Sequence, residues 1–274
     1  MAHTHLLLRY GELFLKGKNR HFFEKALVQN IQRQIPGQPI STPHSRLLMD
    51  YFPHHHQLRR IFGLTSYSPC IQTQKDIHLI TQIILEIVKD LPSTSTFRID
   101  TNRSDKQFPL TSPQINRLIG EQIEQTTSLT FSLKQASTII NIEIGHDAAY
   151  IFTQIIPCAG GLPTGVEGQV FLLIENPASL LAGLSIMKRG CNLIPLGFQP
   201  QDLSLLQKYS PIPLKLQLIK NFPEIEQLAH RKILISGQHF ETYKKYDTSI
   251  MVLRPLIAYS QTEINSSLEL FQRI

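Results

Sequence analysis

The stretch from Phe97 to Arg117, FRIDTNRSDKQFPLTSPQINR, combines residue types that could bind a nucleic acid. Arg103 and Lys106 could contact phosphates, and the ring of Phe108 could stack on an unpaired base. The competing interpretation is a solvated turn with one buried phenylalanine. Spacing alone does not separate these two interpretations.

The elements expected around this stretch would hold those side chains at one edge of a sheet. Phe97, Ile99 and Thr101 alternate with polar residues, which is the pattern of a half-buried strand. Thr111 or Ser112, followed by Pro113, is typical of a helix N-cap with proline at the first helical position. The sequence therefore predicts a strand, a basic loop and the start of a helix.

A second basic segment precedes an expected helix from Arg20 to Gln34, for which Asn19 is the candidate N-cap. Lys16, Lys18 and Arg20 crowd the start of this helix. Cations there oppose the helix dipole, and a bound anion would remove that cost. Anion contact is slightly favoured over a chance cluster of exposed lysines.

Length and charge set broad limits on the class of protein. At 274 residues the chain should hold two or three units, and 42% hydrophobic residues suffice for packed cores. A formal charge of +6 and a pI near 9.2 favour a polyanionic partner. The positive charge is concentrated before Arg60, where the acids are Glu12, Glu24 and Asp50. That half is the expected electrostatic footprint.

The cysteines and histidines do not form a metal or disulfide pattern. Cys70, Cys158 and Cys191 are odd in number and far apart, so a reducing cytoplasm is expected. The consecutive histidines 54–56 cannot easily converge on one ion and are typical of a loop or helix start. The apolar run Leu6–Leu8 is too short for a signal peptide or membrane span.

The second half of the chain begins with a glycine-rich stretch, AGGLPTGVEG, that is typical of a hinge. A βαβ pattern follows, with strands at 169–174 and 192–197 and a helix at 178–189. A nucleotide-binding domain would place its phosphate loop after the first strand, at Glu175–Ser179. That segment has no glycine, and Glu175 would repel a phosphate.

Five segments in this order resemble the tRNA 4-thiouridine synthetases, also called tRNA sulfurtransferases: RYGELFLKGKNRHFF, FGLTSYSP, RSDKQFPLTSPQINRLIG, AGGLPTGVEGQV and AGLSIMKRG. The resemblance is strong over about the first two-thirds of the chain. It implies α/β and α+β folds, comprising an N-terminal ferredoxin-like domain (1–56), a THUMP domain (57–156), a hinge (157–168) and a reduced, doubly wound PP-loop or Rossmann-like domain (169–274).

The resemblance also implies tRNA, through its acceptor end, as the partner. The RNA-contacting positions that it implies are Lys16, Lys18, Asn19, Arg20, Arg103, Lys106, Phe108 and Arg117.

The chain departs from the family where ATP would bind. Members carry a Ser-Gly-Gly-x-Asp-Ser loop, whereas this chain has Glu-Asn-Pro-Ala-Ser at Glu175–Ser179. The family's catalytic cysteine has no counterpart either, so we expect no catalytic residue, cofactor or metal. The leading hypothesis is a non-catalytic, cytoplasmic tRNA-binding protein that presents tRNA to a separate thiolation enzyme. A homodimer is left open.

Two further hypotheses remain. The chain could be an active tRNA sulfurtransferase whose ATP site is atypical or completed by a partner. It could also be a structural or regulatory module without RNA contact, which the basic N-terminal half disfavours.

Overall fold

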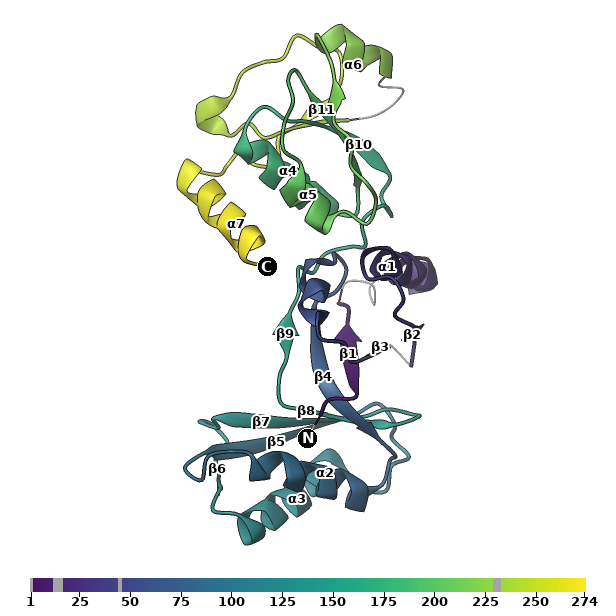
Figure 1. Cartoon of the computed structure of the whole chain (residues 1–274), viewed down its shortest axis with the longest axis vertical. Coiled ribbons are helices and arrows are strands. Elements are labelled where there is room, and N and C mark those ends of the chain that lie inside the picture. Colours follow the sequence, from purple (N-terminus) through teal and green to yellow (C-terminus); the bar gives the residue numbers. More distant parts are fainter. Residues whose placement is uncertain (1, 12–16, 44–45, 229–232) are drawn as a thin grey trace. The chain divides into compact units, whose positions relative to one another are not determined.

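The computed structural model describes residues 2–11, 17–43, 46–228 and 233–274. Backbone contacts divide the chain into two compact units, each of which is discontinuous in sequence. The first unit contains the residues up to Arg9, Gln38–His55 and Ser66–Pro157. The second unit contains Tyr10–Gly37, His56–Thr65 and Cys158–Ile274. Both units mix helices and strands, which confirms the predicted α/β and α+β class (Figure 1).

The first unit is built on one sheet, which has nine strands within the described residues. The strand order is β2-β3-β1-β4-β8-β7-β5-β6, and β9 also pairs with β4. The strands are β1 (His5–Arg9), β2 (Ile40–Ser41), β3 (Leu47–Asp50), β4 (Ser66–Thr73), β5 (Thr96–Arg103), β6 (Thr130–Phe131), β7 (Thr138–Ile144), β8 (Ala149–Phe152) and β9 (Ile156–Pro157). The sheet places the end of β5 beside the end of β7, with which β5 pairs in parallel.

Strand β4 joins the two halves of this sheet. Its Ser66–Cys70 segment pairs antiparallel with β1, and its Ile71–Thr73 segment pairs antiparallel with β8. The burial pattern of β4 explains this position, because Tyr67 to Ile71 are all buried. A strand buried along most of its length is typical of a sheet interior.

Helices α2 (Ile77–Lys89) and α3 (Ser112–Thr126) lie on the same side of strands β5, β7 and β8 (Figure 1). Asp76 caps α2 by accepting hydrogen bonds from the backbone N–H groups of His78 and Leu79, at 2.8 and 3.0 Å. The apolar stripes of both helices pack on an isoleucine-rich core that includes Phe97 and Ile99 of β5. The period-two pattern predicted for this strand is thereby confirmed.

A cluster of three charged side chains connects distant segments of the first unit. Glu143 on β7 accepts hydrogen bonds from Arg9 Nε and Nη2 at 3.0 and 2.8 Å and from Arg46 Nε at 2.9 Å. Arg9 also lies over the Phe152 ring, 4.6 Å from its centroid. The Arg9 and Glu143 side chains are only 14% and 18% exposed, so this ion pair is largely desolvated.

The second unit contains a parallel sheet of five strands among the described residues, in the order β12-β11-β10-β13-β14. In chain order this is 3-2-1-4-5, the arrangement of a doubly wound domain. The strands are β10 (Gln169–Leu173), β11 (Asn192–Gly197), β12 (Gln217–Leu218), β13 (Leu234–Ser236) and β14 (Val252–Leu253). Helices α4 (Pro177–Lys188), α5 (Ser204–Tyr209) and α7 (Gln261–Arg273) contribute to one core, and α6 (Phe222–Leu228) contributes to another.

The N-terminal helix α1 (Arg20–Gln34) belongs to the second unit. The helix has the predicted limits, and its buried Asn30 donates a hydrogen bond to the Thr164 carbonyl at 2.9 Å. Asn19 occupies the N-cap position, as predicted, but it does not cap α1 through its side chain. Asn19 has helical backbone angles, and its side chain makes no capping hydrogen bond.

The glycine-rich stretch packs against the end of α4. Leu162 N–H donates to the Lys188 carbonyl at 2.9 Å, and Gly165 N–H donates to the Gly190 carbonyl at 2.7 Å. Gly161 has φ of +78°, and a Cβ there would lie 2.2 Å from the Lys188 carbonyl oxygen. Only glycine fits this close approach. None of the helices in the described ranges is long and apolar enough to cross a membrane.

Replacing Glu143 by glutamine should lower the free energy of unfolding by about 2–4 kcal/mol, because Arg9 and Arg46 would keep their charges without a carboxylate. Urea denaturation measures this change. Glu86→Gln, which removes an exposed pair with Lys89, is the control and should change the same quantity by less than about 0.5 kcal/mol. Equal effects of the two substitutions would show that the Glu143 cluster contributes no special stability.

Candidate nucleic-acid interface

The basic loop at the end of β5 is held in place by Asp105, whose side chain is buried. Asp105 Oδ2 accepts from Lys75 Nζ at 2.7 Å, and Oδ1 accepts from the Gln107 N–H at 2.9 Å. The N–H groups of Ser104 and Asp105 donate to the Ile144 carbonyl on β7 at 3.0 and 3.4 Å. The Lys75 ammonium and the Gln107 N–H hold the pKa of the Asp105 carboxyl below its usual value. The carboxylate is therefore the charged anchor of the loop.

Arg103 and Lys106 are brought together by this loop. Arg103 Nη1 donates to the Phe108 carbonyl at 3.0 Å, and Lys106 Nζ donates to the Arg103 carbonyl at 2.9 Å. Lys106 is exposed and Arg103 is half-buried. Among the described residues no carboxylate pairs with either side chain, and the partners of both are backbone carbonyls.

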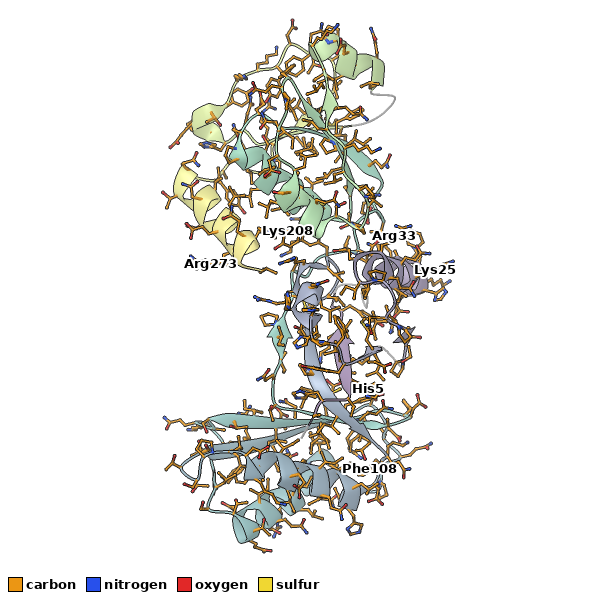
Figure 2. All side chains as sticks on the ribbon, in the orientation of Figure 1. His5, Lys25, Arg33, Phe108, Lys208 and Arg273 are labelled. Atoms are coloured by element: carbon orange, nitrogen blue, oxygen red, sulfur yellow. The ribbon has the colours of Figure 1, made fainter. Side chains whose placement is uncertain are left out.

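Phe108 does not display its ring, and the expectation that it stacks on a base needs correction. The side chain is 8% exposed and belongs to the same core as Ile115 and Phe97. Burying an aromatic ring against α3 stabilises the loop more than exposing it to water would. Phe108, labelled in Figure 2, is therefore a structural support for the two cations.

Helix α3 begins directly after the loop. Thr111 is its N-cap residue, Pro113 follows within the first turn, and the Gln114 side chain accepts from the Thr111 N–H at 2.8 Å. Arg117 on the same helix is 82% exposed and pairs with Glu121 at 2.8 Å. Arg117 is accessible to a partner, but its charge is partly compensated.

The second predicted group lies in the other compact unit. Lys16 lies outside the described residues. Lys18 and Asn19 are exposed, whereas Arg20 donates from Nε to Glu24 at 2.7 Å and from Nη2 to the Tyr10 hydroxyl at 3.2 Å. Burial and a hydrogen bond to Glu24 raise the pKa of Tyr10 to about 12. Among the described members of this group, Lys18 is thus the accessible cation.

The position where a doubly wound domain binds phosphates is the start of α4, between the ends of β10 and β13. Protein groups fill this position. The Asn176 side chain accepts from the Ser179 N–H at 3.3 Å, and the Ser179 hydroxyl accepts from the Glu175 N–H at 3.2 Å. Gly237, which follows β13, approaches so closely that a Cβ on it would lie 2.4 Å from Ser179 N.

A polar network extends from this position into the unit. The Tyr246 hydroxyl donates to Glu175 and lies 2.9 Å from the Ser236 hydroxyl. Lys244 Nζ lies 3.5 Å from Glu175 Oε1. Burial, together with the hydrogen bond to Glu175, raises the pKa of Tyr246. A nucleotide phosphate would have to displace the Glu175 carboxylate, so the residues present do not fit ATP in the usual position.

The three cysteines are poor candidates for nucleophiles. Burial raises the pKa of Cys70 and of Cys158 to about 12, and it also raises the pKa of Cys191. A thiol with a raised pKa has little reactive thiolate at neutral pH. Within the described parts of the chain, no group of three or more His, Cys, Asp or Glu side chains is placed to hold a metal ion.

Sequence reasoning missed two features of these sites. Asp105 and Gln107 have the spacing of an Asx turn, a signal that could have identified Asp105 as the anchor of the loop. The contact of Lys75 with Asp105 spans 30 residues, and the contact of Tyr246 with Glu175 spans 71. No local pattern predicts such pairs.

Comparison with known proteins identifies two domains in the first half of the chain. Residues 5–68 match the family described as the ThiI ferredoxin-like domain. Residues 74–154 match the family described as the THUMP domain. The second match contains the whole basic loop from Arg103 to Phe108.

The similar proteins extend this comparison. A probable tRNA sulfurtransferase of Brevibacillus brevis is 36% identical over 230 residues, which cover 79% of this chain and 58% of that protein. The chain thus spans little more than half the length of such relatives.

Two crystal structures share the fold. The protein PH1313 of Pyrococcus horikoshii has a TM-score of 0.84 at 28% identity, covering 98% of this chain and 99% of that one. A 4-thiouridine synthetase in complex with RNA and ATP has a TM-score of 0.81 at 22% identity, covering 98% of this chain and 85% of that one.

Replacing Asp105 by asparagine should lower the melting temperature at pH 7 because Lys75 loses its carboxylate. Since the folded-state pKa of Asp105 is depressed, its stabilising effect is present above the unfolded pKa of about 3.9 and is lost as the pH falls through the folded pKa. The difference between the parent protein and the variant should therefore shrink below about pH 4. Thermal melts from pH 7 to pH 2.5 measure this difference.

The control for this experiment is Asp100→Asn, which changes an exposed carboxylate on β5. Its melting temperature should follow that of the parent protein at every pH. A constant difference between the parent protein and Asp105→Asn across the whole range would show that the charge of Asp105 does not anchor the loop.

Proposed function

The chain belongs to the tRNA sulfurtransferase (4-thiouridine synthetase) family, and from this premise we propose that it is a tRNA-binding protein that presents tRNA to a separate thiolation enzyme. The observation that carries this proposal is a contrast between two positions. The basic loop on the THUMP domain is ordered around a buried aspartate. The phosphate position at α4 is filled by Glu175, Gly237 and their partners.

Two observations support binding to tRNA: the cations of the basic loop and the similarity to a protein solved with RNA. Arg103 and Lys106 offer two cations at the end of β5, next to the exposed N-terminal turn of α3. Such a surface suits the phosphate backbone of a folded RNA. One solved structure with the same fold is a 4-thiouridine synthetase in complex with RNA and ATP. We take the acceptor end of tRNA as the bound region, as the family resemblance implies.

The absence of ATP-dependent chemistry in this chain is supported by the groups at the start of α4. A phosphate loop needs glycines so that backbone N–H groups can approach the phosphates. Here, Pro177 lacks an N–H group, and the Asn176 side chain already accepts the Ser179 N–H. The Glu175 carboxylate would also repel the ligand.

An active tRNA sulfurtransferase is the second candidate, because relatives that are 36% identical are named probable tRNA sulfurtransferases. This alternative requires the ATP site to be completed by another chain or to work in an unusual way. The chain covers 58% of the Brevibacillus brevis relative, so groups present in that protein could be supplied from elsewhere.

Replacing both Arg103 and Lys106 by alanine should weaken tRNA binding and flatten its salt dependence. Each lost phosphate contact should reduce the slope of log K against log salt by about 0.7–0.9. Fluorescence titrations of tRNA between 50 and 200 mM salt, a range of about fourfold, measure both quantities.

Lys89→Ala is the control for this experiment because it removes an exposed charge at the far end of α2. Lys106→Ala alone is the substitution expected to disturb folding less, because Arg103 also holds the loop through its hydrogen bond to the Phe108 carbonyl. An unchanged slope in the double variant would remove the loop from the proposed RNA surface. Failure of the parent protein to bind tRNA at moderate salt would refute the proposed function.

Calorimetric titration of the purified chain with ATP and magnesium should give no saturable heat, because Glu175 and Gly237 occupy the phosphate position. A positive control is provided by tRNA titrated into the same preparation. Saturable binding of ATP that is abolished by Ser179→Ala would instead place the nucleotide at α4 and favour the active enzyme. A reconstituted thiolation mixture then tests whether that binding is productive.

A further inference from the structure

A cavity of about 330 Å³ lies within the second unit, and its lining includes no residue from the start of α4. It is lined by the ends of α1, the 3-10 helix η2 (His55–Arg60) and α5, together with the loop that follows α5. We call it the α1/α5 pocket. Its polar lining is formed by Arg33, Gln34, Gln57, Arg60, Gln207 and Lys208. Figure 2 labels Arg33 on α1 and Lys208 on α5, which both line it.

The charge of the α1/α5 pocket is unbalanced. Three of its lining residues are cations, and no carboxylate is among them. Arg60 Nε donates to the Ile274 carbonyl at 3.2 Å, whereas Arg33 and Lys208 have no partner among the residues that the structure describes. Two other cations of this unit, Arg20 and Arg273, instead each pair with a glutamate.

Each of the three cations lies in the last turn of its own helix. Favourable interaction with a helix dipole explains one cation at one helix end. It does not explain why three such ends converge on one cavity, where the cations repel one another. A bound anion would turn this repulsion into attraction.

The wall formed by the loop after α5 is fixed by hydrogen bonds. Gln207 Nε2 donates to the Ile212 carbonyl at 3.2 Å, and Gln207 Oε1 accepts from the Leu214 N–H at 2.8 Å. The buried Ser210 hydroxyl donates to the Ile212 carbonyl at 2.7 Å. Pro211 and Pro213 further restrict this backbone.

The supporting elements are fixed as well. Phe62, just after η2, packs on Tyr209 of α5 with ring centroids 5.5 Å apart. The Tyr209 hydroxyl donates to the Phe271 carbonyl at 2.6 Å, and burial raises the pKa of Tyr209 to about 12. The tyrosine therefore stays a donor at neutral pH, and it ties η2, α5 and α7 together. Little reorganisation is needed for the cations to act on one ligand.

We infer that the α1/α5 pocket binds a phosphate group. Guanidinium groups present planar pairs of donors that match phosphate oxygens, and the lysine adds a point charge. The phosphate can belong to an RNA backbone or to a small phosphate-bearing molecule, and the chemistry of recognition is the same. The inference does not depend on the proposed function, because inorganic phosphate alone can test it.

The test is calorimetric titration of the full chain with inorganic phosphate at constant ionic strength, with chloride as the replaced anion. The parent protein should bind phosphate saturably. Arg33→Gln and Lys208→Gln should each weaken binding by about tenfold, and the double variant should abolish it. Lys25→Gln, an equal charge change elsewhere on α1, is the matched control and should bind as the parent does.

Melting temperatures establish that the variants fold, and Arg33→Lys should restore part of the affinity. Absence of saturable phosphate binding by the parent protein overturns the inference. Equal weakening of phosphate binding by Lys25→Gln overturns the inference as well, because phosphate would then be attracted by the total positive charge and not by the pocket.

Titration with tRNA identifies the source of the phosphate. If the double variant also loses tRNA affinity and phosphate competes with tRNA, the pocket holds a backbone phosphate. If tRNA affinity is unchanged while phosphate binding is lost, the pocket holds a small phosphate-bearing molecule. The Lys106→Ala variant should keep full phosphate binding, so failure of the RNA proposal is distinguishable from failure of this one.

Discussion

The hydrogen bonds along β4 are the interaction on which the first unit depends. Strand β4 pairs with β1 through Ser66–Cys70 and with β8 through Ile71–Thr73. The strands on the β1 side and those on the β8 side therefore form a single sheet. The Glu143 carboxylate, held by Arg9 and Arg46, reinforces this connection from β7. Because β7 also pairs with β5, the position of the basic loop is fixed by the same continuous ladder.

The loop at the end of β5 illustrates how a buried negative charge supports nearby positive charges. Asp105 is an acid in a surface proposed to bind a polyanion, yet it lies beneath the loop and is satisfied by Lys75 and a backbone N–H. Phe108 is likewise turned into the core. On the proposed surface, a partner would contact Arg103 and Lys106, whereas Asp105 and Phe108 lie beneath the loop. An ordered loop of this kind loses little conformational entropy on binding.

The second unit shows the opposite arrangement at the place where its fold would bind a nucleotide. The strand order creates the crevice between β10 and β13, where Tyr246 donates to Glu175 and Gly237 lies close to the backbone of Ser179. Two cations of this unit without a described partner, Arg33 and Lys208, instead line the α1/α5 pocket. A doubly wound fold thus fixes where a ligand can bind, and side chains decide whether it does.

The sequence by itself determined the elements whose causes are local. The alternation in β5, the cap at Asp76 and the continuous apolar run of β10 follow from residues within one turn or one strand. The sequence also shows directly that Glu175–Ser179 contains no glycine. Only the tertiary structure decided that Phe108 is buried, that Lys75 anchors Asp105, and that Arg33, Arg60 and Lys208 share one cavity. These facts depend on contacts between segments far apart in the chain, which periodicity and capping rules do not encode.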